Sequence, residues 1–81
     1  MIDNVNNPKH YTQHPSGIEC IEITRHHDFC TGNAMKYLWR AGLKTDPSMS
    51  DIDKEIEDLE KAVWYIHDKI KQLKNKRDHA K

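Results

Sequence analysis

One short stretch of the chain places positive side chains, an amide and a phenol at helical spacing. Residues 31–44 read TGNAMKYLWRAGLK. At about 100° per residue, a helix brings five polar side chains to one side, namely Asn33, Lys36, Tyr37, Arg40 and Lys44. This side carries no carboxylate, although the whole chain has 13 basic and 13 acidic residues. Guanidinium and ammonium groups bind phosphate oxygens, and a phenol ring can stack on a base. The pattern predicts a site for a phosphate group and a base.

Other interpretations of the same residues stay open. A solvated basic face on an ordinary amphipathic helix has the same spacing. The chain contains no P-loop motif, and its three glycines are too few for a Gly-rich phosphate cradle. The histidines and cysteines lack the spacing of zinc ligands, so we expect no metal site from His10, His14, His26, His27, Cys20 and Cys30.

Two pairs of carboxylates support an enzymatic alternative. Glu19 and Glu22 are one helical turn apart, and so are Glu55 and Asp58. Such pairs on facing helices can hold Mg²⁺ against a triphosphate. The MazG-like nucleotide pyrophosphatases use carboxylates in this way, and residues 57–66 resemble them loosely. A helix cap and a solvated acidic face explain the same residues without any catalysis.

The elements that would position these residues are helices, so the expected fold class is all-α. Residues 1–15 have little periodicity and predict an extended N-terminal arm. A single helical domain should follow over residues 16–76, and residues 77–81 should form a frayed C-terminus. The domain should contain two short helices and one long C-terminal helix that assemble into an oligomeric helical bundle.

Capping residues give the expected helix boundaries. Ser16 followed by Glu19 fits a capping box for a first helix that ends at about His27. Thr31 is the expected N-cap of the second helix, which should end at Gly42. Ser50 is the expected N-cap of the long third helix.

The long helix carries apolar residues alternately four and three positions apart: Ile52, Ile56, Leu59, Val63, Ile66, Ile70 and Leu73. This pattern is typical of a coiled coil. A helix of about 26 residues is roughly 39 Å long, which exceeds the approximately 30 Å width of a compact domain of this size. Its acidic first half and basic last third suit the helix dipole and would also let two copies pair antiparallel. We therefore expect a homo-oligomer, a dimer or larger, formed through this helix.

Composition excludes several classes of partner. The formal net charge is zero, so the whole molecule has no field that favours DNA or an anionic membrane. No apolar run approaches the roughly 20 residues that span a bilayer, and the polar N-terminus is unlike a signal peptide. Two cysteines do not make a disulfide scaffold. We expect a cytoplasmic protein with no membrane and no DNA partner.

Four segments together resemble one known group, the SaV-like proteins of tailed phages. They are Asn7 to Tyr11, Gly17 to Glu19, Gly32 to Lys44 and Asp58 to Tyr65, in this order. The resemblance implies a phage protein in the host cytoplasm, similar to a P-loop-less phage nucleotide kinase that phosphorylates deoxynucleoside monophosphates and forms large oligomers. It also implies the site residues Asn7, His10, Tyr11, Asn33, Lys36, Tyr37 and Arg40, and a need for Mg²⁺ if the protein is catalytic.

The combined hypothesis is a nucleotide bound through its phosphates at a subunit interface. Lys36, Arg40 and Lys44 would bind phosphate, Tyr11 and Tyr37 would contact the base, and His10 and Asn33 would add hydrogen bonds. Beside kinase-like transfer, a second hypothesis is an anti-defence sponge that holds a nucleotide-derived immune signal without catalysis. A third is a structural protein that engages a host defence protein through the long helix.

Overall fold

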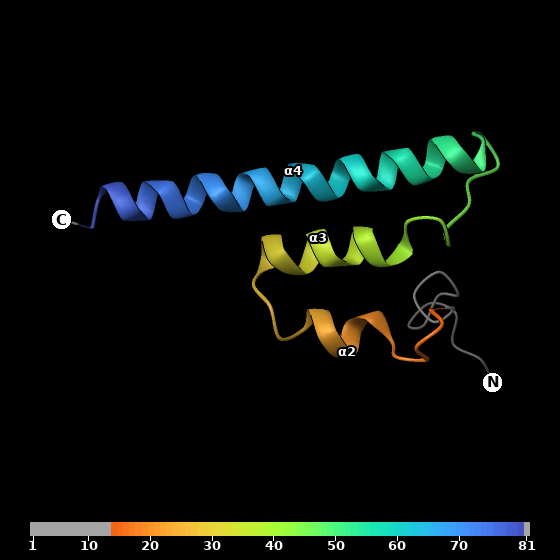
Figure 1. The fold of residues 1–81 in the computed structure, drawn as a ribbon, viewed down its shortest axis with the longest axis horizontal. Coiled ribbons are helices and arrows are strands. Elements are labelled where there is room, and N and C mark those ends of the chain that lie inside the picture. Colours follow the sequence, from red (N-terminus) through yellow and green to blue (C-terminus); the bar gives the residue numbers. More distant parts are fainter. Residues whose placement is uncertain (1–13, 81) are drawn as a thin grey trace.

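The computed structural model describes residues 14–80, and over this range the chain forms three helices and no strand (Figure 1). The helices are α2 (Cys20–Thr24), α3 (Phe29–Arg40) and α4 (Asp51–Asp78). The all-α fold class, with two short helices and one long C-terminal helix, is therefore confirmed. The expected arm lies almost entirely outside the described residues.

Helix α3 lies between the other two helices and packs against both (Figure 1). The 28 residues of α4 make it about 42 Å long at 1.5 Å per residue. The C-terminal part of α4 extends beyond α3, and the molecule measures 53 × 29 × 20 Å (Figure 1). The helix also runs to Asp78 rather than ending at about residue 76. One chain thus leaves much of α4 uncovered.

Two of the expected helix starts are wrong, because a neighbouring carboxylate caps the helix instead. The N-cap of α2 is Glu19, whose backbone N–H donates to Glu22 Oε2 at 2.7 Å. Ser16 belongs to the preceding turn, where its Oγ accepts from the backbone N–H of Ile18. Asp28 caps α3 by accepting from the backbone N–H of Thr31 at 3.0 Å, so Thr31 lies inside the helix.

Two further boundary predictions are confirmed, at Ser50 and at Gly42. Ser50 caps α4, and its Oγ accepts from the backbone N–H of Asp53 at 3.0 Å. Helix α3 ends at Arg40, and Gly42 follows with a φ of +83°. This left-handed conformation favours glycine, which explains why the chain turns here. The end of α2 comes at Thr24, three residues earlier than His27.

Helices α3 and α4 are antiparallel, and polar contacts hold both ends of their interface. At the start of α3, Asp28 Oδ2 lies 3.0 Å from Lys69 Nζ. At the end of α3, Arg40 Nη2 lies 3.1 Å from Asp58 Oδ1. Between these ends the buried apolar residues are small, chiefly Ala34 and Ala62. The interface is close-packed but offers little apolar burial.

A buried ionic cluster of Arg40, Lys54 and Asp58 forms one end of this interface. The three residues are 6%, 3% and 0% exposed, and Lys54 Nζ lies 3.2 Å from Asp58 Oδ1. Lys54 also donates to Glu57 Oε1 at 2.7 Å, and this hydrogen bond is the largest cause of the raised pKa of Lys54. Burial of charge is expensive, so each member depends on the others.

The cluster corrects one sequence-based expectation. We expected Arg40 on an exposed, carboxylate-free face, whereas it is buried and paired with Asp58. A single-helix projection shows only neighbours on the same helix, and Asp58 comes from α4. Leu38, on the same helix, is 52% exposed.

The apolar stripe of α4 faces outward in the single chain. We call it the seam; its members are between 41% and 73% exposed: Ile52, Ile56, Leu59, Val63, Ile66, Ile70 and Leu73. Over residues 14–80, no helix combines the length and the apolar character that crossing a bilayer would require. The seam is thus an apolar face of α4 that the rest of the chain does not cover, with charged residues on both sides of it.

We predict that Asp58→Ala lowers the free energy of unfolding by about 3–5 kcal/mol, because it leaves Arg40 and Lys54 buried without a counter-charge. Urea denaturation followed by circular dichroism measures the change. The matched control is Asp78→Ala at the exposed end of α4, which should change stability by less than about 0.5 kcal/mol.

If Asp58→Ala does not fold, the triple variant Arg40→Met, Lys54→Leu, Asp58→Leu still tests the same idea. It replaces the whole cluster with apolar side chains of similar size and should fold with at least wild-type stability. A loss below about 1 kcal/mol in Asp58→Ala would show that water, rather than protein, surrounds these charges.

We also predict that the Asp28 carboxyl titrates with a pKa of about 2, below its ordinary value of 3.8. The hydrogen bond from the Thr31 backbone is the largest cause, followed by that from Lys69. Because the folded pKa is lowered, the contribution to stability is present above pH 4 and is lost as the pH falls toward 2. Carbon-detected NMR titration measures this pKa directly. In the Lys69→Met variant, Asp28 should retain most of its lowered pKa, because the Thr31 backbone is the larger cause. If Asp28 of the wild type titrates near 3.8, it does not cap α3 as described.

Candidate functional site

The ring of Tyr37 lies at the centre of three cations. Lys36 Nζ and Arg40 Cζ are each 4.5 Å from the ring centroid, and Lys61 Nζ is 5.6 Å from it. Cations at such distances are attracted by the ring quadrupole. The structure thus brings Lys36, Tyr37 and Arg40 together as the helical spacing predicts, and α4 adds Lys61.

The cations around Tyr37 exceed the carboxylates available to them. Asp58 and Glu57 balance the two buried cations of the cluster. Lys61 shares the same Glu57 oxygen, at 3.3 Å, with Lys54. Hydrogen bonds from Lys54 and then Lys61 lower the pKa of Glu57. Among residues 14–80, no carboxylate lies within ion-pair distance of Lys36. A positive excess therefore remains on this surface.

Lys44 adds to the excess from the turn after α3. Lys44 is half-buried, and burial is the largest cause of its lowered pKa. The positive charges of Arg40 and Lys54 lower the pKa of Lys44 further, while the carboxylate of Asp58 raises it. None of the carboxylates in the described range is within ion-pair distance of the Lys44 amine. An anion bound nearby would relieve this repulsion.

Tyr65 is the centre of an aromatic group on the same surface. It stacks on Tyr37 with centroids 5.8 Å apart and 15° between the planes. Trp64 and Phe29 approach Tyr65 edge-on, at 5.0 and 6.0 Å. Trp64 is 62% exposed. Because Tyr65 already stacks on Tyr37, the open ring of Trp64 is better placed to receive a base than Tyr37.

Two hollows flank Lys36. The first, of about 290 Å³, is lined by Tyr37, Lys61, Trp64 and Tyr65. The second, of about 200 Å³, lies between α2 and α3, and its polar lining includes Arg25, His27, Asn33, Lys36 and the carboxylate Asp28. Asn33 Nδ2 donates to the Phe29 carbonyl within its own helix. Lys36 lines the second hollow, and its Nζ lies 4.5 Å from the ring centroid of Tyr37, which lines the first.

Sequence reasoning missed Lys61, Trp64 and Tyr65 as members of this surface. Their spacing of three and then one residue places them on one face of a helix, which is the signal that was available. The predicted residues Asn7, His10 and Tyr11 lie outside the described part of the chain. The surface as described is therefore built from α2, α3 and α4 alone.

The carboxylate alternative is not assembled within one chain. Glu19 and Glu22 cap α2, and Asp58 is buried against Arg40. Helix α3 separates α2 from α4, so the two carboxylate pairs do not face each other (Figure 1). Between residues 14 and 80, no group of three or more His, Cys, Asp or Glu side chains is placed to hold a metal ion.

Comparisons with known proteins give one finding. No curated protein and no solved structure matches the chain. The profile of one family, described as a protein of unknown function (DUF3310), matches residues 5–67. The match includes α2, α3, the first part of α4 and every residue named around Tyr37. Because it covers most of the sequence, this chain belongs to the DUF3310 family.

Proposed function

We propose that this protein binds a nucleotide, with the phosphates between Lys36 and Lys61 and the base on Trp64. The observation that carries the proposal is the convergence of cations on Tyr37 beside an open aromatic hollow. The positive excess favours a phosphate, and the exposed indole ring favours a base. A simple anion would not need the ring, and an uncharged aromatic ligand would not need the amines.

A mononucleotide fits this surface better than a polynucleotide. Net charge is zero over the whole chain, so the cations are local rather than arranged along a track. Pockets for small molecules usually measure about 300–1,000 Å³. The hollow beside Trp64 is close to the low end of this range, at about 290 Å³, and Lys61 is one of its lining residues.

Arg40 has a different role from the one that its position on the helix suggests. Its guanidinium pairs with buried Asp58 and lies over the Tyr37 ring. We assign it to positioning Tyr37 rather than to contact with the ligand. Lys44 contributes positive potential from the edge of the surface, and Asn33 lines the second hollow.

Two outcomes after binding are consistent with the proposal. The resemblance to SaV-like proteins suggests transfer of a phosphoryl group from ATP to a deoxynucleoside monophosphate with Mg²⁺. Transfer requires two nucleotides held in line. The hollows of one chain have room for one, which favours a sponge that holds its ligand unless copies combine. Phosphorus NMR after incubation with ATP, a deoxynucleoside monophosphate and Mg²⁺ distinguishes these outcomes. Formation of a deoxynucleoside diphosphate would indicate transfer, and an unchanged ligand would indicate sequestration.

We predict that nucleotides quench the fluorescence of Trp64. The experiment uses a Trp39→Phe background, because Trp39 lies elsewhere, 4.6 Å from the ring of His14. Titration with a panel of nucleoside monophosphates and triphosphates should give saturable quenching. Inorganic phosphate should compete for the site without quenching, because it has no base to stack.

Removal of a cation should weaken binding in a defined way. Lys61→Ala should raise Kd by about 10- to 100-fold, the range of a hydrogen bond to a charged group. Lys76→Ala, also an exposed lysine on α4, should leave Kd unchanged. Absence of quenching by every nucleotide at millimolar concentration, or an equal effect of both variants, would refute this site.

A further inference from the structure

We infer that the seam of α4 is covered by a second copy of this chain, with the two α4 helices antiparallel. The inference does not depend on the nucleotide proposal. It starts from the exposure of all seven seam residues, which extend along about 32 Å of helix from Ile52 to Leu73. Single proteins rarely leave an apolar surface of this extent open to water.

The apolar face continues from the seam onto α3. A groove of about 300 Å³ between the helices is lined mainly by apolar side chains, among them Ala34, Met35, Leu38, Ile66 and Ile70. Two of these, Ile66 and Ile70, belong to the seam. A second helix placed along the seam could insert side chains into this groove, as knobs fit into holes in a coiled coil.

Charges beside the seam determine the direction of the partner helix. In the heptad pattern, Ile56, Val63 and Ile70 occupy the a positions, and the other seam residues occupy d. The g positions are Glu55, Ala62 and Lys69, and the e positions are Asp53, Glu60, His67 and Lys74.

A parallel pair would bring each g position near the next e position of the partner. Glu55 would then face the partner's Glu60, and Lys69 would face the partner's Lys74, so both contacts would be repulsive. An antiparallel pair brings the e positions together instead. Asp53 then approaches the partner's Lys74, which is attractive. Charge therefore favours the antiparallel pair.

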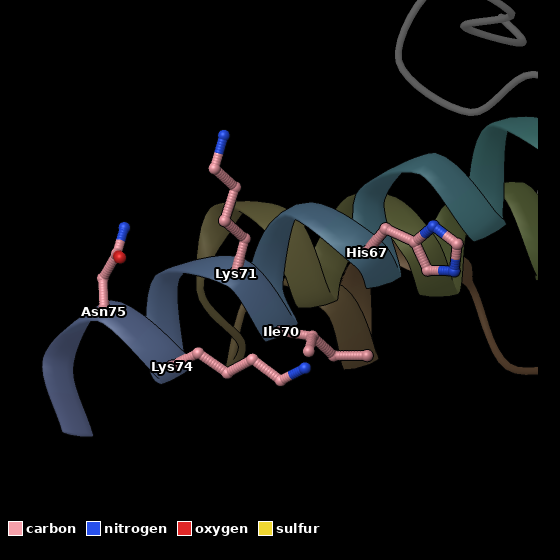
Figure 2. Close-up of a pocket in the computed structure, with 5 residues that line it drawn as sticks. All are labelled: His67, Ile70, Lys71, Lys74 and Asn75. Carbon is pink, nitrogen blue, oxygen red and sulfur yellow. The ribbon is translucent and has the colours of Figure 1, made fainter. Parts of the chain in front are cut away.

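Helix α3 leaves the e side of α4 free for such contacts. On the g side, Ala62 is 1% exposed and Lys69 pairs with Asp28 of the same chain. On the e side of the last third, an open hollow of about 570 Å³ is lined by residues of α4 alone: His67, Ile70, Lys71, Lys74 and Asn75. Figure 2 shows these side chains along the C-terminal part of the helix.

The lining of this hollow includes two lysines and no carboxylate. No carboxylate in the described range lies within ion-pair distance of Lys71 or Lys74. The first half of α4 has the complementary charge, with Asp53 and Glu60 both exposed. An antiparallel second copy brings that acidic half against the hollow.

The first experiment uses sedimentation equilibrium to measure the mass of the wild-type protein in solution, at chain concentrations from about 1 to about 100 µM. We expect two chains per particle and expect Val63→Lys to give single chains. The matched control is Ile21→Lys on α2, since Ile21 and Val63 are 50% and 48% exposed. A wild-type chain that stays single at the highest concentration would overturn the inference and leave the seam to a different partner.

The second experiment tests direction by charge reversal. Lys74→Glu should weaken the antiparallel pair about three- to tenfold, because it faces the partner's acidic half. Adding Asp53→Lys to the same chain should restore most of the affinity. In a parallel pair, Lys74→Glu would instead face the partner's Lys69 and strengthen association. Unchanged or tighter association by Lys74→Glu would therefore overturn the antiparallel arrangement.

Discussion

Asp58 is the group on which the arrangement of α3 and α4 depends. Its Oδ1 accepts from both Arg40 and Lys54 in a place that water does not reach, while Oδ2 has no partner among the described residues. A buried charge of this kind contributes little net stability compared with apolar packing, but its loss leaves the partners uncompensated. We interpret the cluster as a device that fixes how the two helices align. With Arg40 held on Asp58, Tyr37 lies where it can stack on Tyr65.

The position of the cluster reverses the usual distribution of side chains in a helical protein. Charged groups and small residues such as Ala34 and Ala62 occupy the interface, and the large apolar residues of α4 face outward. The reversal creates two different surfaces on one small chain. One side of α4 gathers the cations and aromatic rings, and another carries the seam. Each surface can therefore have its own partner, which is why the nucleotide proposal and the self-association inference can fail separately.

Sequence analysis predicted the local features of this structure better than its long-range ones. The cap at Ser50 and the turn at Gly42 depend on neighbours within about one helical turn, and both are confirmed. The coiled coil that the heptad pattern indicates stays a prediction. The prediction that Thr31 caps α3 failed because Asp28, three residues earlier, offers a charged acceptor. The prediction that Arg40 lies on an exposed face failed for a different reason. Its partner Asp58 is 18 residues away, and no periodicity in the sequence relates the two. For the same reason the contribution of Lys61 and Trp64 to the Tyr37 surface could not be read from α3 alone.

Charge balance links the two surfaces. The chain has equal numbers of acidic and basic residues, yet the region around Tyr37 has more cations than carboxylates. The compensating acids must therefore lie elsewhere, and exposed positions in the first half of α4 hold several of them, including Asp53 and Glu60. If those acids pair with the basic last third of a second copy, they are not available to Lys36 and Lys44. Self-association would then preserve the positive excess that a phosphate group needs, so the same separation of charge that pairs the long helices keeps the cationic surface open.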